Sequence, residues 1–90
     1  MNTSQAARAV LNTSGMSARA VSSALGKSQN YISSLISQAE RMNADMGAST
    51  VASIGDVCGY ALVLVPREEL KSLESAVMID PAKRNRRERD

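Results

Sequence analysis

A glycine turn between two segments of helical pattern is the feature that most restricts how this chain folds. Residues 17–36 read SARAVSSALGKSQNYISSLI, with Gly26 between the two segments. Glycine readily adopts the left-handed backbone that often ends a helix, so we expect the first helix to stop there. Ser17 and Ser28 each precede a segment, and a serine oxygen can accept amide protons that a first helical turn leaves unpaired. The stretch therefore predicts two short, capped helices joined by a tight turn.

The apolar residues of this stretch recur at helical spacing. Val21 and Leu25 lie four residues apart in the first segment. The second segment continues the pattern with Ile32, Leu35 and Ile36. Residues spaced three and four apart share one helix face, so each helix should bury one side. Two helices joined in this way form a helix-turn-helix, whose second helix can lie in a DNA major groove.

The remaining face of the second helix is polar and uncharged. Residues 29–39 contain no Lys, Arg, Asp or Glu, although Lys and Glu are the good helix formers of a merely solvated face. The amides of Gln29 and Asn30 donate and accept, which matches the N6/N7 edge of adenine, and serine hydroxyls suit base edges or phosphates. The alternative is a helical hairpin with a serine-rich solvated surface. The predicted base-reading residues are Gln29, Asn30, Tyr31, Ser33 and Ser34, and the predicted phosphate contacts are Ser17, Arg19, Lys27, Ser28 and Ser37.

The same residues resemble the Cro/repressor-type helix-turn-helix family, the lambda-repressor-like (XRE) domains. That family's pattern is a Ser, a Leu-Ala pair, Leu-Gly, Ser and Ile. It is met at matching spacing by Ser17, Val21-Ser22, Leu25-Gly26, Ser28 and Ile32. Ala18 replaces a Gln that often contacts a phosphate, and Ser22 replaces the Ala of the pair. The Glu-x-Gly that often closes the recognition helix is absent, and residues 37–49 form a longer stretch than usual.

The resemblance covers roughly residues 5–65 and implies a sequence-specific DNA-binding transcriptional regulator. It would be a homodimeric bacterial or phage-type repressor that inserts its third helix into the major groove. The two half-sites would lie about one helical turn apart on double-stranded DNA, giving a palindromic operator. Some repressors and antitoxins of this family dimerise through a C-terminal strand.

The fold class expected is mainly α, a four-to-five-helix lambda-repressor-like domain over residues 1–59. The first helix should cover about residues 4–13, and the third should continue to about Met42. Ser49 or Thr50 should cap a fourth helix that Gly59 ends. The inward side chains expected are Ala6, Ala7, Val10 and Leu11 in the first helix, and Val51, Ile54, Val57 and Cys58 in the fourth.

Residues 60–80 are expected to form a dimerisation element of one or two strands and a short helix. Residues 60–65 read YALVLV and end at Pro66, which favours a buried strand. Residues 76–80 are a second candidate strand, and residues 67–75 a short helix. A strand needs a partner for its backbone groups, supplied either by a second copy, which we favour, or by a hairpin within one chain. The predicted dimer interface is Tyr60, Leu62, Val63, Leu64 and Val65.

The amino-acid composition predicts a small cytoplasmic protein with a light core. The chain has 90 residues with no Phe and no Trp, so its core must be light and should gain from dimerisation. Cys58 is the only cysteine, which excludes an intramolecular disulfide and fits a cytoplasmic location. No apolar run is long enough for a membrane, and the first residues lack a secretory pattern.

The chain shows no sign of catalytic chemistry. It has no His, which removes the commonest general base and metal ligand, and one Cys cannot make a zinc site. We therefore expect no enzyme activity, no metal and no cofactor. Residues 81–90 carry five basic and two acidic residues, and we expect a disordered basic tail, either solvated or in contact with DNA phosphates.

Two other functions remain as alternatives. One is an antitoxin that autoregulates its operon and binds a toxin protein through the region from about Pro66. The other is a protein-interaction module without DNA binding. The apolar residues available to a protein partner are Leu70, Leu73, Val77, Met78 and Ile79.

Overall fold

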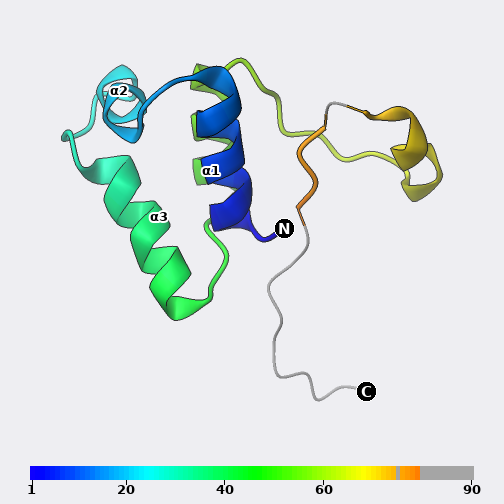
Figure 1. Cartoon of the computed structure of the whole chain (residues 1–90), viewed down its shortest axis with the longest axis horizontal. Coiled ribbons are helices and arrows are strands. Elements are labelled where there is room, and N and C mark those ends of the chain that lie inside the picture. The colour runs from blue at the N-terminus through cyan, green and yellow to red at the C-terminus, as the bar shows by residue number, and fades with distance from the viewer. Residues whose placement is uncertain (75, 80–90) are drawn as a thin grey trace.

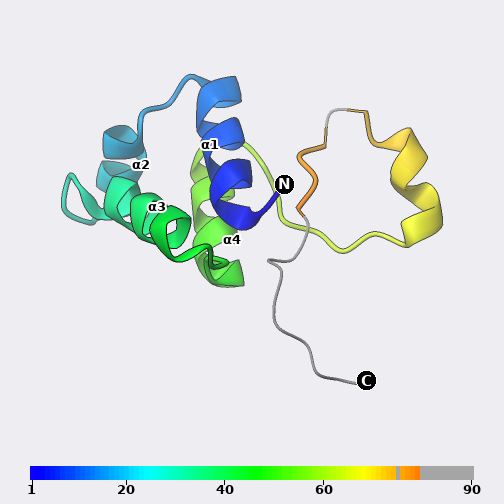
Figure 2. The same cartoon turned by 60° about the horizontal axis from the view of Figure 1, so that its bottom comes forward.

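The chain folds into a bundle of four short α-helices followed by an extended arm. The computed structural model describes residues 1–74 and 76–79. Helix α3 packs against α1 and α2, and α4 packs against the same two helices. Figures 1 and 2 show α2 and α3 beside α1, with α4 behind α1. The helices are α1 (Thr3–Ser14), α2 (Ala18–Ala24), α3 (Tyr31–Met42), α4 (Ala48–Val57) and, in the arm, the 3₁₀-helix η1 (Arg67–Ser72).

A small aliphatic core joins all four α-helices. Val21 and Ile32 are fully buried, and Ile36 and Ile54 are nearly so. These side chains come from α2, α3 and α4, and they pack with Ala7 and Leu11 of α1. Since each buried aliphatic side chain contributes roughly 1.5–3 kcal/mol, these few contacts hold the bundle together. The inward faces expected of α1, α2 and α3 are confirmed.

The turn after α2 ends the helix as the glycine predicts. Gly26 has a φ of +71°, in the left-handed region. The Gly26 N–H donates to the Ser23 carbonyl at 3.0 Å, and the Lys27 N–H donates to the Ser22 carbonyl at 2.9 Å. This pair of bonds closes the helix end in the Schellman arrangement. Ser17 caps the start of α2, because its Oγ accepts the Ala20 N–H at 3.0 Å.

The caps predicted for α3 and α4 are wrong. Helix α3 begins at Tyr31, so Ser28 lies in the preceding turn, where its carbonyl and not its side chain accepts the Tyr31 N–H. Helix α4 begins at Ala48 after Gly47, whose backbone is extended and provides no side-chain cap. Ser49 and Thr50 therefore lie inside the helix, two and three residues after the N-cap position, and do not cap it.

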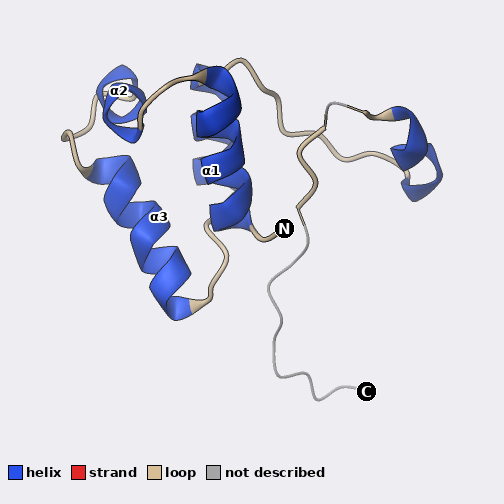
Figure 3. Ribbon diagram, viewed as in Figure 1, coloured by secondary structure: helices blue, strands red, loops and turns tan. Residues whose placement is uncertain are grey.

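The predicted strands are absent from residues 60–74 and 76–79, which form the arm. Residues 60–65 are irregular, and so are residues 76–79; Figure 3 shows no strand in the described chain. None of the N–H groups of residues 61–65 donates to a described residue. A strand requires a neighbour for these groups, and the two segments do not pair with each other. The expected helix in the arm is confirmed as η1, whereas Asp80 and the basic tail lie outside the described residues.

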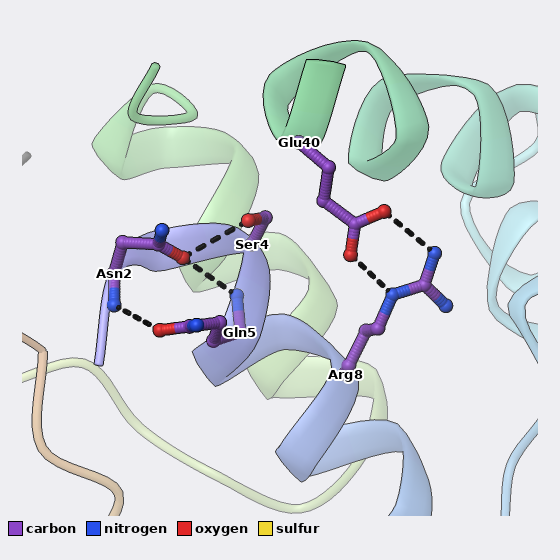
Figure 4. A network of polar contacts seen from close by, with 5 residues as sticks. All are labelled: Asn2, Ser4, Gln5, Arg8 and Glu40. Atoms are coloured by element: carbon purple, nitrogen blue, oxygen red, sulfur yellow. Dashed lines mark hydrogen bonds and ion pairs between the residues drawn. The ribbon is translucent and has the colours of Figure 1, made fainter. Parts of the chain in front are cut away.

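The N-terminal end of α1 is fixed by a network of polar side chains. Asn2 Oδ1 accepts the Gln5 N–H at 2.9 Å, and Gln5 Oε1 accepts the Asn2 N–H at 3.0 Å. This reciprocal pair is a capping box, and Asn2 also accepts a bond from the Ser4 hydroxyl (Figure 4). The Thr3 hydroxyl accepts the Met46 N–H at 2.7 Å. Helix α1 is thereby tied to the loop that leads into α4.

An exposed ion pair joins α1 to the end of α3. Arg8 forms two bonds with Glu40, from Nε to Oε2 at 2.5 Å and from Nη2 to Oε1 at 3.0 Å (Figure 4). The hydrogen bond from Arg8 lowers the pKa of the Glu40 carboxyl, and the same bond raises the pKa of Arg8. Because the folded pKa of Glu40 lies below its unfolded value, the pair stabilises the fold above the unfolded pKa. This contribution is lost as the pH falls through the folded pKa.

We expect Glu40→Gln to lower the unfolding temperature slightly at about pH 7 and to match the wild type at about pH 2, where the carboxyl is protonated. Thermal unfolding followed by circular dichroism at both pH values measures this difference. Glu68→Gln, which removes the same charge from an exposed residue of η1, is the matched control. Equal effects of the two substitutions at neutral pH would mean that only net charge matters.

Candidate nucleic-acid interface

A continuous polar stripe runs along the outer side of α3. Asn30, Ser34, Ser37 and Arg41 are spaced four, three and four residues apart and are all exposed. Residues at this spacing lie on one helix face, and the opposite face carries the buried Ile32, Ile36 and Ala39. The four residues Asn30, Ser34, Ser37 and Arg41 are called the outer stripe below. Their side chains are one short amide and two hydroxyls, with one guanidinium near the end of the helix.

The sequence pattern predicted Gln29 and Asn30 within the helix, whereas both stand just before it, because α3 begins at Tyr31. Gln29 and Asn30 are exposed in the turn that precedes Tyr31. Asn30 occupies the N-cap position, yet its side chain makes no capping bond to α3. Its amide is therefore not engaged with the helix end. In helix-turn-helix proteins the residues at the start of the second helix are those that reach base edges.

Tyr31 and Ser33 are less suited to base reading than the sequence suggested. Tyr31 is half-buried and packs against the core. The Lys27 ammonium lies 5.4 Å from the centre of its ring, within the range of a cation–π contact. The Tyr31 ring therefore packs against the core and holds the Lys27 ammonium over its face. Ser33 is exposed, but its hydroxyl donates to the Asn30 carbonyl at 3.2 Å.

The residues predicted to contact phosphates are all exposed. Arg19 and Ser17 lie at the start of α2, Lys27 and Ser28 in the turn, and Ser37 on the outer stripe. Ser17 Oγ already accepts the Ala20 N–H, and its own O–H remains able to donate. The five predicted phosphate contacts thus come from α2, the turn and α3, three successive parts of one helix-turn-helix unit.

The charge distribution favours an anionic partner at this unit. The first acidic residue of the chain is Glu40, and it is bonded to Arg8. In the part of the chain that the structure describes, Arg19, Lys27 and Arg41 make no ion pair. Three exposed cations thus surround a helix face without a carboxylate of its own.

Sequence reasoning missed two exposed polar residues of α3, Gln38 and Arg41. Gln38 lies beside the outer stripe, and its amide makes only a 3.9 Å contact to the Met42 sulfur. Arg41 continues the stripe by one more turn. Helical spacing could have predicted Arg41, because steps of four, three and four residues from Asn30 along α3 reach residue 41.

A second, apolar surface lies on the arm. Leu62, Val63 and Leu64 are 49%, 65% and 101% exposed. Tyr60 and Val65 are half-buried. The Met1 amino group donates to the Met78 carbonyl at 3.4 Å, which brings the end of the arm back to the start of α1 (Figure 1). Between the arm, α1 and α4 lies an apolar groove of about 610 Å³.

Comparison with known proteins identified no matching family model, no matching curated protein and no matching solved structure. No helix within the described residues has the length and hydropathy needed to cross a membrane. Among those same residues there is also no group of three or more His, Cys, Asp or Glu side chains arranged to hold a metal ion.

Proposed function

We propose that this protein is a sequence-specific DNA-binding transcriptional regulator, a homodimeric repressor that reads a palindromic operator with α3. The observation that supports this proposal is the outer stripe of α3 together with Gln29. These residues form an exposed face of amides and hydroxyls that runs from the start of α3 to the Arg41 guanidinium near its end, on a helix that packs against α2. Such side chains provide hydrogen bonds for base edges, and the exposed cations around them provide phosphate contacts.

The roles of the individual residues follow from their positions. Asn30 and Gln29 lie at the N-terminal end of α3, which enters the groove, and each amide can bond adenine N6 and N7 together. Ser34 lies one turn further along the same face. Arg19, Lys27 and Arg41 then neutralise phosphates on either side of the groove.

The arm supplies the proposed dimer interface. Leu62, Val63 and Leu64 expose large apolar side chains, and the backbone N–H groups of residues 61–65 have no described acceptor. A second copy that pairs with this segment would cover the apolar side chains and supply acceptors for the backbone N–H groups. Two recognition helices would then face successive major grooves.

The exposed apolar residues at the end of the arm favour a second candidate, an antitoxin that also regulates its own operon. Leu73, Met78 and Ile79 are 38%, 43% and 37% exposed. A toxin bound there would cover them while α3 remained available to DNA. A module that binds only protein is the third reading, and it requires that the outer stripe has no affinity for DNA.

We expect the full chain to enrich an inverted repeat from a random pool of DNA duplexes at physiological salt. The half-sites should be centred about one helical turn, 10–10.5 base pairs, apart. A folded protein that enriches no sequence would contradict the proposal and favour the protein-interaction reading. An enriched single half-site would retain DNA recognition and reject the dimer.

Asn30→Ala should weaken binding to the enriched duplex by about 1–3 kcal/mol and relax the preference at one base position. Asn12→Ala is the matched control, since Asn12 is also exposed but lies on α1. Fluorescence anisotropy with the enriched duplex and with single-base variants measures both effects. A uniform loss over all sequences would show that Asn30 contacts the backbone and not a base.

Leu64→Asp should convert the protein to a monomer without unfolding it, because the wild-type side chain is fully exposed in the single chain. Ser72→Asp places the same charge elsewhere on the arm and should leave the dimer intact. Analytical ultracentrifugation measures the mass, and circular dichroism measures the helix content. A dimer that persists in Leu64→Asp would exclude residues 62–64 from the interface.

A further inference from the structure

A buried serine joins the two helices of the helix-turn-helix. Ser22 lies in the middle of α2 and has no exposed surface. Its hydroxyl donates to the Ala18 carbonyl at 2.9 Å. The same oxygen accepts the N–H of Ile32, ten residues further along the chain, at 3.0 Å. Ser22 therefore makes one bond within its own helix and one across to α3.

The bond to Ile32 completes the start of α3. The first N–H groups of a helix have no acceptor within it and need one from elsewhere. The Tyr31 N–H is bonded to the Ser28 carbonyl, and the Asn30 side chain makes no capping bond. Ser22 thus acts as a cap from a neighbouring helix, in place of the cap that the sequence had assigned to Ser28.

One residue consequently links both ends of the turn. The Ser22 carbonyl accepts the Lys27 N–H at 2.9 Å, and this bond closes the end of α2. The Ser22 hydroxyl accepts the Ile32 N–H at the start of α3. These two bonds fix where the chain leaves one helix and where it enters the next. Gln29 and Asn30 lie between the two bonded amides of Lys27 and Ile32.

The bond from Ile32 to Ser22 is directional, and its burial makes it costly to lose. A buried N–H without an acceptor keeps its full desolvation penalty, whereas an apolar contact tolerates small shifts. An alanine at this position would fill the space but would offer no oxygen to the Ile32 N–H. The serine therefore adds an orientation constraint that packing alone would not impose.

From these contacts we infer that Ser22 is a positioning residue for DNA recognition, which sets the placement of Asn30 and the outer stripe without touching DNA. The inference rests on the proposed function and adds to it a determinant of specificity on α2. Loss of the bond leaves the start of α3 free to fray, and DNA binding must then reorder it.

The test compares Ser22→Ala and Ser22→Cys with the wild type. Alanine removes the oxygen, and cysteine keeps nearly the same shape but offers only a weak acceptor. Ile54→Val is the control for lost stability, because it trims a buried side chain of the same core on α4 without removing the hydrogen bond between Ser22 and Ile32. All measurements use the full chain at a temperature where each variant is folded, with the duplex enriched from the random pool.

Two readouts are expected to change together. Hydrogen exchange measured by NMR should be faster at the Ile32 amide in both Ser22 variants, while the Ile36 amide stays protected. Affinity for the enriched duplex should fall about tenfold in Ser22→Ala, with reduced discrimination against a scrambled duplex. Ile54→Val should retain both affinity and discrimination. The cysteine variant should change in the same direction, and it serves alone if the alanine variant does not fold.

Each contrary result overturns a defined step. Unchanged exchange at Ile32 would show that the Ser22 bond does not hold the start of α3. Faster exchange with DNA affinity and discrimination equal to those of Ile54→Val would reject the positioning role. If the wild type enriches no duplex, the proposed function fails and the positioning role with it, while the Ile32 amide still reports the bond itself.

Discussion

Ile32 is held in two ways, and the orientation of the whole helix-turn-helix depends on it. Its side chain is fully buried against Val21, Ile36 and Ile54, and its amide is bonded to Ser22. The apolar contact fixes which face of α3 points inward, and the hydrogen bond fixes where α3 begins. Together they present the outer stripe to solvent as a defined surface. A core of this size leaves little redundancy, so each of these contacts matters for the placement of the helix.

The helical body could be predicted from the sequence because the information is local. Apolar spacing placed Ala6, Val21 and Ile36 in the core, and Gly26 marked a turn whose geometry requires a left-handed residue. The Ser17 cap of α2 is confirmed, whereas the cap of α3 was misplaced because a serine before a helix is only one possible acceptor. The Ile32 amide instead uses Ser22, and a pairing across ten residues leaves no mark in local spacing.

The arm and the end of the candidate site show the other limit of sequence reasoning. Residues 60–65 have strand composition, but a strand is a relation between two segments, and the pattern of one segment does not name its partner. On α3, the polar pattern of the first turns does not by itself point to Gln38 and Arg41, although the uninterrupted helix extends the same face to Met42. Residues 60–65 thus have the composition of a strand, but whether they form one depends on a partner segment that their own sequence does not specify.

The Arg8–Glu40 pair also changes the electrostatic potential at the end of α3. Glu40 directly precedes Arg41 of the outer stripe, and an unpaired carboxylate there would offset the guanidinium beside it. Arg8 reaches from α1 and neutralises that carboxylate. Helix α1, which forms no part of the stripe, thereby screens the one negative charge of α3 and leaves Arg41 as its net charge. The exposed ion pair contributes little to the free energy of folding, and it also changes the electrostatic potential at this end of α3.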